Sequence, residues 1–152
     1  MTTRVFASLL LLLLALGVVG PTTGLATDAP PRTITIEPQG NQLAFATKAF
    51  TVQAGETVRL VFKNTATSPA MQHNVVLLNT MDDAAATRVG QAALSAADFV
   101  PDDPAVMAAT PVAKPGETVS VTFTAPEAPG KYRFLCTFPG HYVSMQGTMT
   151  VK

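Results

Sequence analysis

The fold class of this 152-residue chain is decided by residues 115–136, PGETVSVTFTAPEAPGKYRFLC. Over residues 119–124 apolar side chains alternate with Ser and Thr, which is the period of a half-buried β-strand. A Pro-Gly turn at residues 129–130 follows, and residues 132–136 again place every other side chain on one apolar face. We therefore expect two short strands separated by a turn.

Similar short runs occur along the rest of the chain, and turn residues separate them. The further runs with strand character are residues 33–36, 43–52, 58–62, 74–78 and 147–151. The alternation of strands and helices that is typical of a parallel sheet is absent from this sequence. Seven or eight short strands with frequent turns predict an all-β protein, a Greek-key antiparallel β-sandwich.

One alanine-rich stretch, residues 82–97, interrupts the strand pattern and has apolar residues at helical spacing. Asp82 and Asp83 suit the start of a helix, because negative side chains stabilise the free N–H groups there. The sequence predicts one inserted helix of about four turns over residues 82–97. A long loop rich in Pro and Asp is expected after it, through Pro111.

The N-terminal residues 1–26 have the layout of a secretory signal peptide. Arg4 precedes fifteen uncharged residues, Val5 to Val19, and small residues up to Ala26 offer a cleavage site. An uncleaved membrane anchor is the alternative, although a span needs about 20 apolar residues. In either case the chain is exported to the periplasm or another space outside the cytoplasm, tethered to the membrane only if the segment is retained.

The remaining sequence divides into a proline-containing linker, residues 27–32, and one domain, residues 33–152. Removal of residues 1–26 takes away Arg4 and no acidic residue, which leaves a net charge of −1. This charge argues against nucleic acid as a partner. A domain of this size buries enough surface to fold without disulfides, and we expect it to act as a monomer.

Both histidines and the only cysteine fall in two short motifs. His73 stands in Met-Gln-His-Asn-Val, at the start of the apolar run 74–78, and Cys136 and His141 stand in Cys-Thr-Phe-Pro-Gly-His, with Met145 shortly after. Loops at one end of a sandwich lie close together, and sandwich domains place their sites there. We therefore expect these four side chains to meet.

Two imidazoles, one thiolate and one thioether favour copper. A trigonal His₂Cys set with a weak, long axial Met is typical of electron-transfer copper centres, whereas zinc prefers a second thiolate or a carboxylate. Taken singly, Cys136 is as well explained as a buried apolar residue, His73 as a hydrogen-bonded core residue and Met145 as packing. Their joint occurrence in ligand-compatible positions predicts one copper ion per chain.

Residues 71–74 and 132–151 resemble the copper-binding segments of the blue copper proteins, or cupredoxins, among them the azurins and auracyanins. The resemblance extends over residues 33–152 and implies a cupredoxin-like sandwich. It implies His73, Cys136 and His141 as equatorial copper ligands. It further implies Met145 as the weak axial ligand and the carbonyl group of Gln72 on the opposite side.

The same resemblance implies supporting roles for two other residues. Asn74 would tie the two ligand segments together, and the backbone N–H of Phe138 would point at the Cys136 sulfur. The chain cannot form the disulfide usual in azurins, because it has a single cysteine. Three residues separate His141 from Met145, which is the azurin spacing, so the sequence leaves the subfamily open between azurin and auracyanin.

The function predicted from these features is that of a type 1 copper protein that carries single electrons between redox partners and is not an enzyme. Its partners would be cytochrome-type proteins or membrane electron-transfer complexes. His141, in an exposed loop, would be the outlet for the electron, within an apolar rim of Met71, Pro139 and Tyr142. A copper-buffering protein with the same ligands is one alternative, and a secreted hydrolase with Cys136 as nucleophile is another.

Overall fold

The smaller of two β-sheets consists of three strands, of which the central one buries every second side chain. The structure, a computed structural model, describes residues 30–152. The smaller sheet has the order β1 (Arg32–Ile36), β3 (Thr57–Lys63), β6 (Thr118–Thr124). In β3, the side chains of Val58, Leu60 and Phe62 are buried and those between them lie at or near the surface. The period of two in the sequence thus defines the face toward the core.

The larger sheet has five strands and carries the functional loops. Its order is β2 (Ala49–Val52), β8 (Gln146–Val151), β7 (Gly130–Leu135), β4 (Val76–Leu78), β5 (Val106–Ala109). Strand β4 is buried on both faces, since Leu77 faces the space between the sheets whereas Val76 and Leu78 pack under the helix. That position explains why its sequence is a continuous apolar run.

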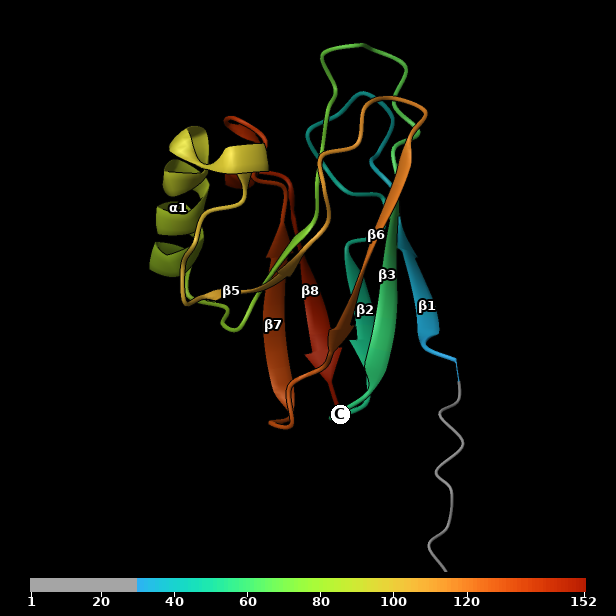
Figure 1. Ribbon diagram of the computed structural model, residues 1–152, viewed down its shortest axis with the longest axis vertical. Coiled ribbons are helices and arrows are strands. Elements are labelled where there is room, and N and C mark those ends of the chain that lie inside the picture. Colours follow the sequence, from blue (N-terminus) through green and yellow to red (C-terminus); the bar gives the residue numbers. More distant parts are fainter. Residues whose placement is uncertain (1–29) are drawn as a thin grey trace, which may run out of the picture.

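The two sheets pack face to face, and α1 covers an outer flank of the larger sheet (Figure 1). Aromatic side chains fill the space between the sheets; the ring centroid of Phe134 lies 5.2 Å from that of Phe45 and 5.5 Å from that of Phe50. The prediction of an all-β sandwich with eight strands and one inserted helix is therefore confirmed.

Two strand pairings differ from the predicted antiparallel arrangement. β1 runs parallel to β3, and β2 runs parallel to β8. Between β1 and β3 the chain crosses to the other sheet to form β2, and this crossover lets β3 return in the direction of β1. Both sheets are therefore mixed, and the expectation of a purely antiparallel sandwich is wrong.

Strand β5 was not expected, because Val106–Ala109 lies in the stretch predicted as a loop through Pro111. Its four residues, VMAA, are all apolar and all half-buried, so the sequence does not show the alternation by which a strand is recognised. It is an edge strand that pairs with β4, with a register irregularity between Leu77 and Leu78. Pairing with a neighbour, which a single segment does not reveal, makes it a strand.

The inserted helix is shorter than residues 82–97. Helix α1 spans Asp83–Ala92 and begins at the carboxylate of Asp82, which accepts a hydrogen bond from the N–H of Ala84 at 3.0 Å. Two single turns of 3-10 helix follow, η1 (Ala93–Ser95) and η2 (Ala97–Phe99), separated by Ala96 in an extended conformation. Alanine propensity favoured a longer helix, but the break at Ala96 turns the chain back toward the sheet.

The predicted signal peptide, residues 1–26, and half of the predicted linker, residues 27–29, lie outside the described residues. Strand β1 begins at Arg32, the last residue of that linker, whose Nε donates to Oε1 of Glu56 at 2.6 Å. Within residues 30–152, no helix has both the length and the apolar character needed to cross a membrane.

Candidate metal centre

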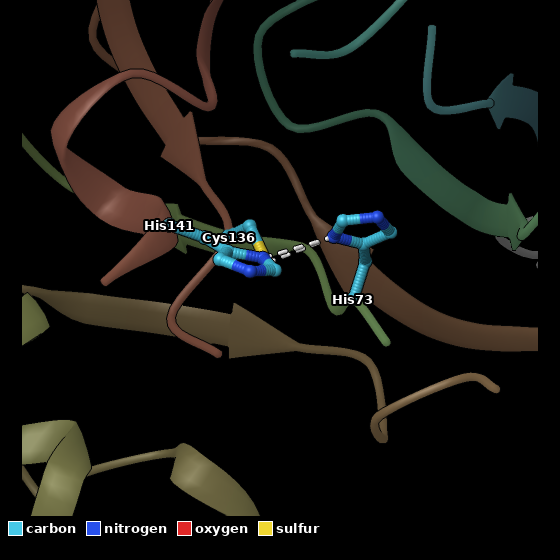
Figure 2. A group of neighbouring side chains, drawn as sticks. All are labelled: His73, Cys136 and His141. Atoms are coloured by element: carbon cyan, nitrogen blue, oxygen red, sulfur yellow. Dashed lines mark hydrogen bonds between the residues drawn. The ribbon is translucent and has the colours of Figure 1, made fainter. Parts of the chain in front are cut away.

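The side chains of His73, Cys136 and His141 meet at one end of the sandwich (Figure 2). The two imidazole Nδ1 atoms lie 3.0 Å apart, although 68 residues separate the histidines. The Cys136 Sγ lies 3.8 Å from Nδ1 of His73 and 3.6 Å from Nδ1 of His141. His73 and Cys136 are 0% exposed and His141 is 7% exposed. The expected meeting of these three side chains is therefore observed.

These three atoms have the spacing of ligands around one metal ion. The three separations of 3.0, 3.6 and 3.8 Å form a triangle whose centre lies about 2.0 Å from each corner. Metal–imidazole and metal–thiolate bonds are about 2.0–2.3 Å long for first-row ions such as zinc. The residues present therefore fit a small metal ion, with the Nδ1 atoms and the sulfur as donors.

Burial keeps all three side chains electrically neutral in the absence of a metal. It lowers the pKa of His73 to about 4, with a further contribution from the neighbouring His141, and it also lowers the pKa of His141. Neutral imidazole is the form that binds metals. Burial raises the pKa of the Cys136 thiol to about 12, so a metal that binds here must displace the thiol proton.

Two backbone N–H groups point at the Cys136 sulfur and partly oppose the effect of burial on its pKa. They belong to Asn74 and Phe138, one in each ligand segment. The predicted direction of the Phe138 N–H is therefore observed. Because these N–H groups favour a negative sulfur, they stabilise the thiolate that a metal requires.

Asn74 ties the segment of His73 to the segment of Cys136. Its Oδ1 accepts a hydrogen bond from the backbone N–H of Thr137 at 2.8 Å, and its Nδ2 donates to Thr137 Oγ1 at 2.8 Å. The Thr137 hydroxyl donates in turn to the carbonyl of Phe99 at 2.6 Å. Asn74 and Thr137 are both 0% exposed, so water does not compete for these bonds.

Hydrogen bonds within the chain also close the loop from Cys136 to Met145. The N–H of His141 donates to the carbonyl of Phe138 at 2.9 Å, and the N–H of Met145 donates to the carbonyl of His141 at 2.9 Å. Gly140 has a φ of 80°, which an L-residue rarely adopts. The turn places His141 at the start of a short 3-10 helix, η3 (His141–Val143).

The other predicted site residues lie around this centre. Met145 is fully buried in the same core cluster as Cys136, and its carbonyl accepts from the Cys136 N–H at 3.0 Å. Gln72 is half-buried, directly before His73. In the predicted rim, Pro139 is exposed and Met71 half-buried, whereas the Tyr142 side chain packs against α1.

Sequence reasoning missed two groups that support the centre. The backbone of His73 pairs with Ala113, donating at 3.2 Å and accepting at 2.8 Å. The ring of Phe99 packs edge-on to Phe138 at 5.1 Å, and Phe138 lies 5.2 Å from the His141 ring. No local pattern in the sequence signals either contact, because each joins segments that are distant in the chain.

A buried His₂Cys set at one end of a mixed β-sandwich is typical of copper proteins that transfer electrons. The chain belongs to the plastocyanin/azurin family of copper-binding proteins, whose family model matches residues 32–152. The family resemblance seen in the sequence is thereby confirmed, and with it copper as the metal of the site.

Individual relatives include both auracyanins and azurins. Auracyanin-A of Chloroflexus aurantiacus is 44% identical over 126 residues, which cover 80% of this chain and 75% of that protein. Azurin of Pseudomonas fluorescens biotype C is 36% identical over 118 residues, which cover 74% of this chain and 92% of that protein. The solved structure of auracyanin A, described as a "blue" copper protein from Chloroflexus aurantiacus, matches with a TM-score of 0.74 and 43% identity. That match covers 81% of this chain and 100% of the solved one.

Proposed function

We propose that this protein is a type 1 copper protein that carries single electrons outside the cytoplasm. The observation that carries the proposal is the buried triangle of two imidazole Nδ1 atoms and one sulfur, 3.0–3.8 Å apart. His73, Cys136 and His141 are the proposed equatorial ligands of one copper ion. Copper in this site would supply a one-electron couple between Cu(I) and Cu(II).

The chain holds the proposed ligands in positions that need to change little when the copper ion gains or loses an electron. The bonds between Asn74 and Thr137 fix the distance between the two ligand segments, and the closed loop fixes His141 relative to Met145. Full burial of Cys136 and His73 keeps water away from the sulfur. A rigid, dry site accepts a change of oxidation state with small rearrangement.

Met145 and Gln72 are proposed to supply the two weak axial donors. Met145 is supported by its complete burial in the cluster that contains Cys136 and by its backbone bond to that residue. Gln72 is supported by its position directly before His73. Among residues 30–152, no N–H donates to the Gln72 carbonyl, which leaves that oxygen available.

We propose His141 as the outlet for the electron. It is the one equatorial ligand with surface exposure, at 7%, and Pro139 and Val143 beside it are exposed, Val143 at 71%. Such an apolar surface around a redox centre favours short-lived contact with a partner. The partners would be other redox proteins, cytochrome-type or in membrane complexes, and the protein would act as a monomer.

Of the two other functions that the same residues could serve, hydrolysis receives less support than electron transport. A hydrolase needs an exposed, reactive thiolate, whereas Cys136 is fully buried and its thiol has a pKa raised to about 12. A copper-buffering protein needs the same ligands but has no requirement for rapid electron exchange. Kinetics therefore separate buffering from transport.

The test is to load the protein with Cu(II) and follow its colour and its electron exchange. We expect intense visible absorption from the bond between thiolate and copper, loss of that colour with a one-electron reductant, and rapid recovery with a small haem protein as oxidant. Cys136→Ser is the matched control and should stay colourless. Absence of the absorption would overturn the site, and slow exchange with the colour intact would favour buffering.

A further inference from the structure

Tyr142, the residue directly after the proposed ligand His141, lies against the backbone of helix α1 at Gly90. A Cβ atom added to Gly90 would overlap the Tyr142 ring at Cγ, Cδ1 and Cδ2. The ring therefore occupies the space that any other residue at position 90 would fill. Glycine is unfavourable inside a helix, and the close approach of this ring is a physical reason for it here.

The helix under Tyr142 is firmly attached to the rest of the domain. Nη2 of Arg133, in β7, donates to Asp83 Oδ1 at 2.7 Å and to the Met81 carbonyl at 2.8 Å. Arg88 forms a two-point ion pair with Asp103, at 2.8 and 3.1 Å. The inner face of α1 packs on the second core cluster, against which Tyr142 also packs. Helix α1 is thus a fixed support on which the ring rests.

On its other side, Tyr142 belongs to the loop that carries His141. The Tyr142 carbonyl accepts a hydrogen bond from Nε2 of Gln146 at 2.6 Å. The neighbouring His141 carbonyl accepts from the N–H of Met145 at 2.9 Å. A displacement of the Tyr142 ring therefore moves the peptide of His141 and strains the bond that closes the loop.

The contact at Gly90 is localised. A pocket of about 280 Å³ separates the first turns of α1 from Tyr142, Val143 and Gln146. The helix and the loop diverge at this pocket, whereas at Gly90 the Tyr142 ring lies directly against the helix backbone.

From these contacts we infer that Gly90 and Tyr142 are positioning residues for the metal centre. The contact between the Tyr142 ring and Gly90 holds the η3 loop in place. It thereby keeps His141 where it can coordinate a metal, before the metal binds. The role of His141 as a ligand rests on the proposed function, whereas the effect of the contact on the loop does not.

The first experiment uses the full-length protein without metal and measures amide hydrogen exchange. The reporter is the N–H of Met145, which is bonded to His141, and the internal reference is Leu60 in the centre of β3. Relative to that reference, we expect Met145 to exchange at least tenfold faster in Tyr142→Ala and to be unchanged in Tyr142→Phe. Equal protection of Met145 in wild type and Tyr142→Ala overturns the inference.

Gly90→Ala provides a second, independent variant, with Gln91→Ala on the exposed face of the same helix as its control. Gly90→Ala should displace the ring and accelerate Met145 exchange, whereas Gln91→Ala should not. In the Tyr142→Ala background, Gly90→Ala should have no further effect, because the ring that it displaces is gone. Additive effects of the two substitutions would show that they act separately and would overturn the inference.

The second experiment loads the same proteins with copper and measures extraction by a chelator and the visible spectrum. Tyr142→Ala should release copper at least tenfold faster than wild type and alter the spectrum, while Tyr142→Phe and Gln91→Ala match wild type. If wild type forms no copper–thiolate absorption, the proposed function fails and the exchange data still decide the positioning role. If wild type forms it and Tyr142→Ala releases copper at the wild-type rate, the inference alone fails.

Discussion

The side chain of Asn74 bonds to both the backbone N–H and the hydroxyl of Thr137, each at 2.8 Å, across 63 residues of sequence. Asn74 follows His73, and Thr137 follows Cys136, so these two bonds join the two segments that carry the ligands. Both side chains are fully buried. These bonds therefore hold the proposed ligands at the correct distance from one another.

Removal of this link should destabilise the protein. Asn74→Ala leaves the buried N–H of Thr137 without a partner, which costs about 1–3 kcal/mol. We expect a decrease of that size in the free energy of unfolding of the metal-free protein, measured with denaturant. Asn79→Ala is the control, since Asn79 is exposed and donates one bond to Pro104, and it should change stability by only about 0.5 kcal/mol. Equal effects of the two variants would contradict the role of the link.

Cys136→Ser should abolish the strong visible absorption and weaken copper binding while the sandwich stays folded. The thiolate is the soft ligand of the set, and the loss of one buried sulfur costs about 0.5–3 kcal/mol. Absorption spectra and circular dichroism of the copper-loaded protein measure the two effects. An intensely coloured variant would refute Cys136 as a ligand.

The two histidines should differ in their response to added imidazole. His141 has 7% exposure and His73 has none, so an external imidazole has a shorter path to the space left by His141→Gly. We expect imidazole to restore the copper–thiolate spectrum of His141→Gly and to restore that of His73→Gly poorly. Titration of both variants with imidazole checks this difference, and equal recovery would mean that exposure does not control access.

Met145 should tune the reduction potential without deciding whether copper binds. Met145→Leu removes a donor from which Cu(II) gains more than Cu(I), so the potential should rise. Met145→Gln supplies a harder oxygen that favours Cu(II), so the potential should fall. Voltammetry measures both shifts, and both variants should still bind copper. Shifts in the same direction would contradict an axial role and leave Met145 as a packing residue.

The ion pair between Arg88 and Asp103 should give stability that depends on pH. Hydrogen bonds from the Arg88 guanidinium and from the Ala105 N–H lower the pKa of Asp103 from 3.8 to about 2. The folded state therefore favours the ionised carboxylate, so the contribution is complete above about pH 4 and is lost as the pH falls toward 2. Asp103→Asn should flatten the pH dependence of the unfolding free energy in this window. An unchanged slope would show that the pair is not formed in solution.

The chemistry of the site could be predicted because three of its four key side chains stand close together in the sequence. Cys136, His141 and Met145 lie within one loop, so their types and spacing alone indicate a soft-metal site. The remaining proposed ligand, His73, could be named because the chain has only two histidines. Its distance of 3.0 Å from His141 is a product of folding.

Where apolar and polar residues alternate, as in β3, the period of two indicated both the strand and its buried face. It did not determine strand direction, because a strand has the same alternation whichever way it runs. The parallel pairs β1–β3 and β2–β8, and the edge strand β5, were decided by pairing between distant segments. Such pairing cannot be predicted from the sequence of one segment alone.

The sequence by itself determined the sandwich class, the ligand types and the presence of one helix. Only the tertiary structure decided where that helix ends and what it does. Its end at Ala92 and the turn through Asp98 and Phe99 depend on contacts with Thr137 and Phe138. The contact between Tyr142 and Gly90 joins residues that are 52 positions apart in the chain. Side-chain periodicity and propensity are local properties, whereas these contacts exist only after the sheets have brought distant segments together.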